Sequence, residues 1–185
     1  PLVEKYPELE DSYGKFGLVD TSLQHQLRDG KYQQRFEGGV RSACFVKWPG
    51  MINAGAVNQN IYSGVDLFTS FLQVAGAEVP TGRVIDGKPM IESVITNKPV
   101  RNTFYAFAPQ KEVQGVRYNN WKLVIDKRGG KTSLLLFNLA NDPSELNDLA
   151  SKNKNIVQTM YNLATSAEQA VVNNLPLQET NNFNF

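Results

Sequence analysis

Four short runs of β-prone residues, followed by one long helical pattern, constrain the fold of this chain more than any other feature of its sequence. The runs occupy residues 102–108, 114–118, 121–126 and 132–140. Between the second and third runs, the pair Asn119-Asn120 tolerates positive φ and predicts a tight hairpin. Apolar residues then recur at helical spacing from Ile156 to Val171. Together these features predict an antiparallel sheet with one long amphipathic helix that covers one of its faces.

The part of the chain before residue 77 shows a different pattern. Residues 42–48, "SACFVKW", form an apolar run closed by Pro49, which predicts a buried strand and a buried, unreactive Cys44 thiol. Residues 65–75 are apolar nearly all round a helix and precede Gly76, a typical C-cap residue, so they predict a buried helix. A strand, a loop and a helix in this order are typical of an α/β layer.

A segment rich in proline and glycine, residues 77–101, separates the two patterns. Such a composition is typical of a linker, so we expect a domain boundary near its end. Residues 1–100 would then form the end of a large, incomplete α/β domain, and residues 101–175 a small domain of antiparallel sheet plus helix. Residues 176–185 would be a tail, in which Phe183 and Phe185 could dock on the small domain.

Charge and cysteine content exclude several kinds of protein. The sequence has 19 basic and 18 acidic residues, and this balance points neither to a nucleic-acid partner nor to a membrane surface. Its single cysteine excludes an internal disulfide and a cysteine-rich zinc site. No apolar run approaches the ~18 residues that a membrane-spanning helix needs.

Five sequence blocks occur in an informative order. The first comprises "LRDGKYQQRFEGGVR" and "FVKWPG", and the next two are "SGVDLFTSFLQVAGAEVP" and "VIDGKPM". The last two are "GVRYNNWKLV" and "LFNLANDPSELNDLA". In this order they resemble the blocks "L-R-G-G-K-x-x-x-x-E-G-G-x-R…WPG", "S-x-x-D-L-x-P-T-L-L-x-L-A-G", "DG-x-S-L", "A-V-R-x-G-x-W-K-L" and "L-Y-D-L-x-x-D-P-x-E-x-x-N-L-A". These blocks characterise the type I sulfatases, the arylsulfatase-like sulfuric ester hydrolases, and the resemblance covers their carboxy-terminal part only.

The resemblance implies a fold that agrees with the patterns described above. Sulfatases of this type have an alkaline-phosphatase-like α/β fold, with the active site at the carboxyl ends of the strands of a large domain. A small antiparallel sheet packed on one long helix follows that domain. Residues 42–48 would be a late strand and residues 65–75 a helix of the large domain, and residues after about 101 would form the small domain.

The resemblance assigns the lysine that contacts the sulfate group to Lys31, which makes it a candidate for both catalysis and substrate binding. A fixed cation beside the ester oxygens lowers the barrier, because cleavage of the S–O bond moves charge onto the leaving oxygen. Gly30 would let the backbone approach the substrate closely. A solvated loop lysine is the alternative interpretation of Lys31.

His25 is the only histidine of the chain, and histidine can act as an acid or base near neutral pH. The resemblance places it at a position that borders the substrate, so it is a substrate-binding candidate, with an ordinary surface histidine as the alternative. Arg28 and Arg41 could attract an anionic ester or form structural ion pairs. Glu37 is interpreted as a residue that shapes the loop.

The resemblance also implies two groups that this sequence does not encode. The family uses a formylglycine nucleophile made within "[CS]-x-P-x-R", and it binds a divalent metal, usually calcium, through Asp-Asp and Asp-Asn or Asp-His pairs. The sequence contains neither that pentapeptide nor any of those pairs. We therefore expect this chain to bind no metal or cofactor itself, and assign calcium and formylglycine to an intact enzyme.

Two hypotheses follow, and enzymatic activity of the chain itself stays open between them. In the first, the chain is the carboxy-terminal segment of a sulfatase that acts on sulfate monoesters together with a missing amino-terminal half, and it is inactive alone. In the second, it is a non-catalytic, sulfatase-derived binding or interaction module. An exposed apolar patch around residues 42–48 and 65–75 would favour the first hypothesis. The natural ester, the oligomeric state and the compartment stay open, although this family is commonly exported, periplasmic or lysosomal.

Overall fold

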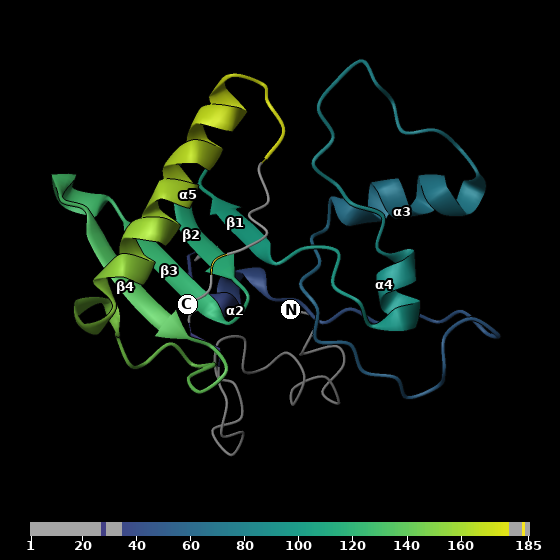
Figure 1. The fold of residues 1–185 in the computed structure, drawn as a ribbon, viewed down its shortest axis with the longest axis horizontal. Coiled ribbons are helices and arrows are strands. Elements are labelled where there is room, and N and C mark those ends of the chain that lie inside the picture. Colours follow the sequence, from purple (N-terminus) through teal and green to yellow (C-terminus); the bar gives the residue numbers. More distant parts are fainter. Residues whose placement is uncertain (1–26, 29–34, 178–182, 184–185) are drawn as a thin grey trace, which may run out of the picture.

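The computed structural model describes residues 27–28, 35–177 and 183, which form two parts that lie side by side (Figure 1). One part is a four-stranded sheet that carries helix α5 (Lys154–Val172). The other part contains α3 (Asp66–Ala75) and α4 (Ile91–Thr96) and stands next to the β1 edge of the sheet. The remaining elements are β1 (Thr103–Phe107), β2 (Val113–Tyr118), β3 (Trp121–Asp126), β4 (Ser133–Asn138), α2 (Glu37–Val40), η3 (Arg128–Gly130) and η4 (Ala150–Lys152).

The sheet is antiparallel throughout, in the order β1-β2-β3-β4. Strands β2 and β3 are joined by a tight hairpin in which Tyr118 pairs with Trp121, and Asn119 has φ 52°. The antiparallel sheet, the hairpin and the long helix are therefore confirmed. Over the described residues, no helix combines the length and apolar character needed to cross a membrane.

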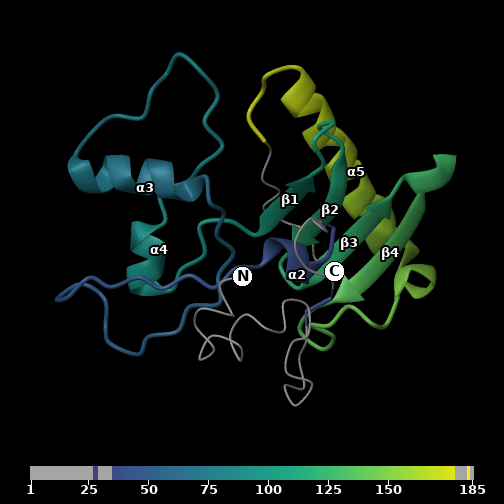
Figure 2. The same ribbon diagram turned by 180° about the vertical axis from the view of Figure 1, so that it is seen from behind.

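Both faces of the sheet are covered, by different parts of the chain. On one face, Leu123, Ile125 and Leu136 pack with Ile156 and Met160 of α5 in the main core. On the opposite face, Val124 and Phe137 pack with Phe36, which immediately precedes α2. Figures 1 and 2 show α2 on the side of the sheet turned away from α5. Since successive side chains of a strand point to opposite faces, Lys122 points toward the α2 side together with Val124.

The end of the chain docks on the sheet at one described position. The Phe183 ring lies edge-on to the Tyr118 ring at a centroid distance of 5.6 Å, and the Phe183 N–H donates a hydrogen bond of 3.1 Å to the Tyr118 hydroxyl. Docking of Phe183 is therefore confirmed, whereas Phe185 lies outside the described residues.

The strand predicted for residues 42–48 is wrong for this structure. These residues form no strand, and Phe45 is 95% exposed. Cys44 is exposed too, so the prediction of a buried thiol is also wrong. A strand is stable only beside hydrogen-bonded neighbours, and the sheet found in the described part of the chain consists of β1 to β4 alone. The apolar run therefore has no sheet to join here.

Helix α3 forms where it was predicted, but it buries its polar face. Gly76 ends it with φ 66°, and its N–H donates to the carbonyls of Leu72 and Gln73. Asp66, Thr69 and Ser70 are the buried residues of this helix, whereas Phe71 is 65% exposed. The prediction of a buried apolar helix is therefore wrong for this structure. Several of its apolar side chains face solvent: Leu67, Phe68, Phe71 and Val74.

The polar face of α3 holds the segment that leads to the sheet. The Asp66 carboxylate accepts hydrogen bonds from the Lys88 N–H at 2.9 Å and from the Arg101 guanidinium. The Ser70 hydroxyl accepts another from the Met90 N–H at 2.9 Å. These bonds bring Gly87 against the start of the helix, where a Cβ atom on Gly87 would lie 2.3 Å from the Val65 carbonyl oxygen. Only glycine fits at this position without a backbone shift.

Replacing Gly87 by alanine is expected to lower the free energy of unfolding by about 1–3 kcal/mol, because the new methyl group overlaps the Val65 carbonyl. The measurement is urea denaturation of the chain, with Gly82→Ala as the matched control. Gly82 has open space at its Cβ position and no positive φ. Both changes reduce the entropy of the unfolded chain alike, so the difference between them reports the contact. Equal stability of the two variants would contradict the prediction.

Candidate functional site

The two site residues predicted from the sequence, His25 and Lys31, lie outside the described residues. The structure describes the chain on either side of Lys31, namely residues 27–28 before it and residues 35–41 after it. The site can therefore be built from these two flanks and from the side chains that hold them.

Both flanks are attached to the α2 face of the sheet and to each other. The Gly38 N–H donates a 3.0 Å hydrogen bond to the Arg28 carbonyl. The Arg28 guanidinium carbon lies 4.1 Å from the centre of the Phe36 ring, a cation–π contact, and Phe36 is buried against the sheet. Arg35 forms a 3.1 Å ion pair with Asp126 at the end of β3. The two flanks thus meet at one place on the sheet.

A buried ionic cluster lies beneath this meeting point, centred on Glu37. Its Oε1 accepts from Lys122 Nζ at 2.9 Å, and its Oε2 accepts from Arg117 Nη1 at 3.1 Å. Lys122 has no exposed surface in its side chain, although it is a lysine in the middle of β3. Burial lowers the pKa of the Arg117 guanidinium, and the charge of Glu37 opposes this effect. The carboxylate is therefore held by two cations from adjacent strands.

Glu145 completes the cluster from the loop after β4. Its Oε2 accepts a 2.8 Å hydrogen bond from the Glu37 N–H, and its carbonyl accepts a 2.9 Å hydrogen bond from Arg28 Nη1. Its backbone adopts φ 54°, a left-handed conformation that is uncommon for a non-glycine residue. Its Oε1 is buried, and no hydrogen-bond partner for it exists among the described residues.

The position of Glu145 disfavours its charged form. Burial raises the pKa of its carboxyl from 4.5 to about 7, and the neighbouring Glu37 carboxylate acts in the same direction. The hydrogen bond from the Glu37 N–H and the charges of Lys122 and Arg28 oppose this rise. A proton on Oε1 would neutralise the second of two adjacent buried carboxylates, so Glu145 is a proton-holding group near neutral pH.

The cluster can hold a segment in place, but it cannot itself bind a substrate, because Glu37, Lys122 and Glu145 are all buried. The sequence patterns do not predict Lys122 or Glu145 as members of a site. A signal exists for each of them: Lys122 is a charged residue flanked by apolar ones in "WKLVID", and Glu145 lies in a block shared with a known family. Glu37, interpreted as loop-shaping, is the centre of the cluster.

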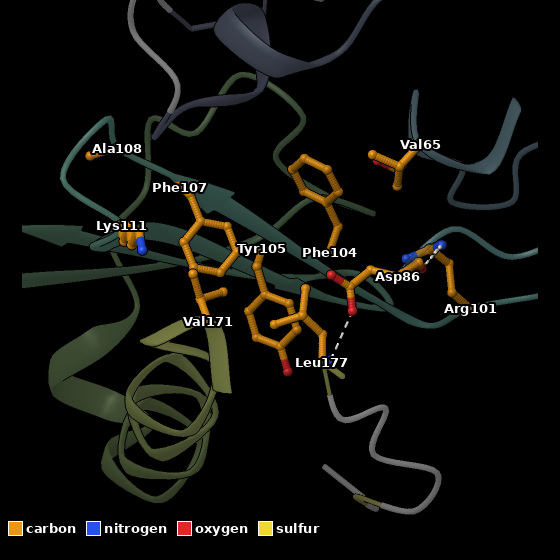
Figure 3. Close-up of a pocket in the computed structure, with 11 residues that line it drawn as sticks. Val65, Asp86, Arg101, Phe104, Tyr105, Phe107, Ala108, Lys111, Val171 and Leu177 are labelled. Atoms are coloured by element: carbon orange, nitrogen blue, oxygen red, sulfur yellow. Dashed lines mark hydrogen bonds between the residues drawn. The ribbon is translucent and has the colours of Figure 1, made fainter. Parts of the chain in front are cut away.

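A separate cavity of about 320 Å³ lies between the two parts of the molecule (Figure 3). Figure 3 shows the rings of Tyr105 and Phe107 beside Val171 and Leu177, with Asp86 next to Leu177 and Arg101 on the far side of Asp86. The Asp86 carboxylate accepts a 2.9 Å hydrogen bond from the Leu177 N–H, and Arg101 pairs with the buried Asp66. Its lining is mainly apolar, with Ser63, Asp86, Arg101 and Lys111 as polar members, and no hydrogen bond between a nucleophile and a general base is found among these described residues.

The described residues do not fit a metal site of the kind that oxygen-preferring cations require. Within residues 27–28, 35–177 and 183, no group of three or more His, Cys, Asp or Glu side chains is placed to hold an ion. Glu37 and Glu145 are close together, but Glu37 is already neutralised by Lys122 and Arg117.

Comparison with known proteins adds independent information. A family model described as "N-sulphoglucosamine sulphohydrolase, C-terminal" matches residues 25–171. An N-acetylgalactosamine-6-sulfatase of Sus scrofa is 42% identical over 72 residues, which cover 37% of this chain and 14% of that protein. A sulfatase of Formosa agariphila is 29% identical over 159 residues, which cover 77% of this chain and 28% of that protein.

A solved structure shares the fold over most of the chain. The crystal structure of Ps i-CgsB in complex with k-i-k-neocarrahexaose superimposes with a TM-score of 0.64 at 26% identity. The match covers 82% of this chain and 34% of that one. The chain thus spans 14% to 34% of the length of these relatives, and it corresponds to a part of them.

The raised pKa of Glu145 predicts how stability depends on pH. Because the folded chain keeps the Glu145 proton up to about pH 7 and the unfolded chain loses it near 4.5, the free energy of unfolding falls as pH rises through this window. Glu145→Gln imitates the protonated form and keeps an oxygen for the Glu37 N–H. We expect it to remove this part of the fall, on the order of 3 kcal/mol at most.

Urea denaturation of both proteins at several pH values between 4.5 and 7 checks this prediction. Glu78→Gln, at an exposed carboxylate outside the cluster, is the control and should follow the wild-type pH dependence. A Glu145→Gln variant whose stability falls with pH as steeply as that of the wild type would show that Glu145 is ionised throughout.

Proposed function

The chain belongs to the sulfatase family, whose carboxy-terminal region it represents, and we propose from this premise that it takes part in hydrolysis of sulfate monoesters as the carboxy-terminal segment of a sulfatase. The family model covers residues 25–171, which include all members of the buried ionic cluster. Arg28 and Glu37 come from the first block of the family resemblance, Arg117 and Lys122 from the fourth, and Glu145 from the fifth. One cluster therefore joins three of the five blocks.

The observation that carries this proposal is the exposed apolar surface of the part that contains α3 and of residues 42–48. Phe45 is 95% exposed and Phe71 is 65% exposed, and Val46, Leu67, Phe68 and Val74 are exposed as well. Large apolar side chains gathered on one helix face mark a surface that other polypeptide covers. We propose that the covering polypeptide is the remainder of the large α/β domain, so that residues 42–48 join its sheet. A free-standing binding module would bury these side chains itself.

In this proposal, Lys31 binds the sulfate group and stabilises the charge that develops during S–O cleavage. An ammonium at ~4 Å from the sulfate contributes roughly 4 kcal/mol of attraction at an effective dielectric of about 20, before desolvation is subtracted. His25 would border the substrate. What supports this assignment is the gapless match of "LRDGK" to the "L-R-G-G-K" that opens the family block and the attachment of both flanks of Lys31 to the sheet.

We further propose that the formylglycine nucleophile and the calcium ion of the reaction are held by polypeptide outside this chain. The absence of "[CS]-x-P-x-R" from the sequence supports this proposal, as does the lack of a suitable carboxylate group among the described residues. The domain boundary is placed near Arg101, whose ion pair with Asp66 links the two parts. Relatives named for N-acetylgalactosamine 6-sulfate and N-sulphoglucosamine chemistry make saccharide sulfates the first substrates to test.

The purified 185-residue chain is expected to show no turnover of para-nitrophenyl sulfate, because the groups that react with sulfur lie outside it. The measurement is release of para-nitrophenol. A complete sulfatase polypeptide that contains this chain, produced with its formylglycine, is the positive control. Release of para-nitrophenol by the isolated chain above the uncatalysed rate would contradict the proposal that the nucleophile and the calcium ion are held outside this chain.

In that complete polypeptide, Lys31→Ala is expected to lower kcat/KM for a sulfate monoester by roughly 10²–10³-fold, the range found when one preorganised charge-stabilising group is removed. Lys154→Ala, at an exposed lysine on the first turn of α5, is the control and should keep the wild-type value. A Lys31→Ala enzyme as active as this control would make Lys31 an ordinary loop lysine.

A further inference from the structure

We propose that Glu37 is a positioning residue of the sulfatase reaction, which fixes the segment carrying Lys31 to the small domain through its buried contacts with Lys122, Arg117 and Glu145. This inference rests on the proposed function of Lys31. It assigns a role in the reaction to side chains of the small sheet that never touch the substrate.

The first step is that both flanks of Lys31 converge on Glu37 and Glu145. Residue 28 is bound through its side chain to the Glu145 carbonyl at 2.9 Å and through its own carbonyl to the Gly38 N–H at 3.0 Å. Glu37 is bound through its N–H to Glu145 Oε2 at 2.8 Å. The two described flanks therefore meet at one point, and the ion pair between Glu37 and Lys122 anchors that point to the sheet; this pair is called the anchor below.

The second step concerns reach. Lys31 follows Arg28 by three residues and precedes Arg35 by four. Arg28 and Arg35 are therefore the described arginines that flank Lys31 most closely in the sequence. Since a displacement of ~1 Å in a reacting group can reduce a rate by about 10²-fold, a shift of these flanks is expected to lower the rate.

The third step is that the anchor is more polar than packing alone requires. Lys122 is completely buried, and burying an ion pair generally gives no more stability than an apolar pair of similar volume. What a charged pair adds is direction: the ammonium and the two carboxylate oxygens define one position for Glu37. The choice of lysine and glutamate here fits a role in placement better than a role in stability.

The fourth step is that β2 leaves room for the crossing segment. A Cβ atom at Gly115 would lie 3.1 Å from the Arg35 carbonyl oxygen and 3.3 Å from Lys122 Cε. Gly115 has no positive φ, so its backbone conformation does not call for glycine. The glycine is needed because the segment and the lysine both approach the strand closely. Gly115→Ala would therefore press on the anchor without changing any charge.

The test is a double-mutant cycle in a complete sulfatase polypeptide that contains this chain, with kcat and KM measured for para-nitrophenyl sulfate and Ki for inorganic sulfate. The single variants are Glu37→Gln and Lys31→Ala, and the double variant combines them. If Glu37 acts through Lys31, Glu37→Gln lowers kcat/KM by roughly 10- to 100-fold in the wild type but by less than about 2-fold in the Lys31→Ala background. The Ki for sulfate rises in the first case and stays unchanged in the second.

Lys127→Met is the matched control for the loss of an ion pair. Lys127 directly follows β3 and forms a 2.9 Å ion pair with Glu168 of α5 and a 3.8 Å ion pair with Glu112, neither of which belongs to the buried ionic cluster. The Lys127→Met variant should have a slightly lower thermal stability and an unchanged kcat/KM. All variants are assayed at a temperature where circular dichroism shows them folded. If Glu37→Gln does not fold, Glu37→Gln/Lys122→Met removes both charges together, and Gly115→Ala perturbs the anchor sterically.

The outcomes separate the inference from the proposed function on which it rests. A normal Lys31→Ala enzyme refutes the sulfate-binding role of Lys31 itself. An impaired Lys31→Ala enzyme with a normal Glu37→Gln enzyme overturns the positioning role alone. Equal losses from Glu37→Gln in both backgrounds also overturn it, because they show a general structural defect that does not act through Lys31.

Discussion

The ion pair between Glu37 and Lys122 is the interaction on which the arrangement of the chain around its sheet depends. It joins a residue just before a glycine pair to the centre of β3, 85 positions later, with no exposed surface on the lysine. An unpaired charge at this depth would be strongly destabilising, so the segment that carries Glu37 must cross the sheet here and nowhere else. Phe36 then covers Val124 and Phe137, and the second face of the sheet is closed.

The two parts of the molecule differ in what they bury. The sheet and α5 enclose an apolar core of their own, from Val116 and Leu123 to Met160. Helix α3 instead buries Asp66 and Ser70, which bind backbone groups at residues 88 and 90, and turns its phenylalanines to solvent. An apolar face gives little stability when it stays in water, whereas it contributes about 25 cal/mol per Å² once covered. The sheet and α5 thus have an apolar core of their own, whereas the part that contains α3 leaves its apolar face exposed.

Features that depend on residues near one another in the sequence were predicted correctly, whereas features that depend on contacts between distant residues were not. The hairpin at Asn119-Asn120 and helix α5 depend on residues near in sequence, and both are confirmed. The strand predicted for residues 42–48 is wrong for this structure, because a strand needs hydrogen-bonded neighbours and the described residues provide none for this run. The ionic cluster could not be predicted, because Glu37, Lys122 and Glu145 meet only after the sheet has formed. From the sequence, Glu37 is interpreted only as a residue that shapes its loop, and no pattern singles out Lys122 or Glu145.

The contacts between the two parts also attach α3 to the sheet. Arg101 pairs with Asp66 at the start of α3, and Asp86 accepts the N–H of Leu177 just after α5. These contacts set the orientation of α3 relative to the sheet, while Glu37 sets the position of the Lys31 flanks on the same sheet. Any polypeptide that packs on the exposed face of α3 is therefore held at a defined place relative to those flanks. The Glu37 cluster and the contacts of Arg101 and Asp86 thus attach two separate segments, the flanks of Lys31 and α3, to the same sheet.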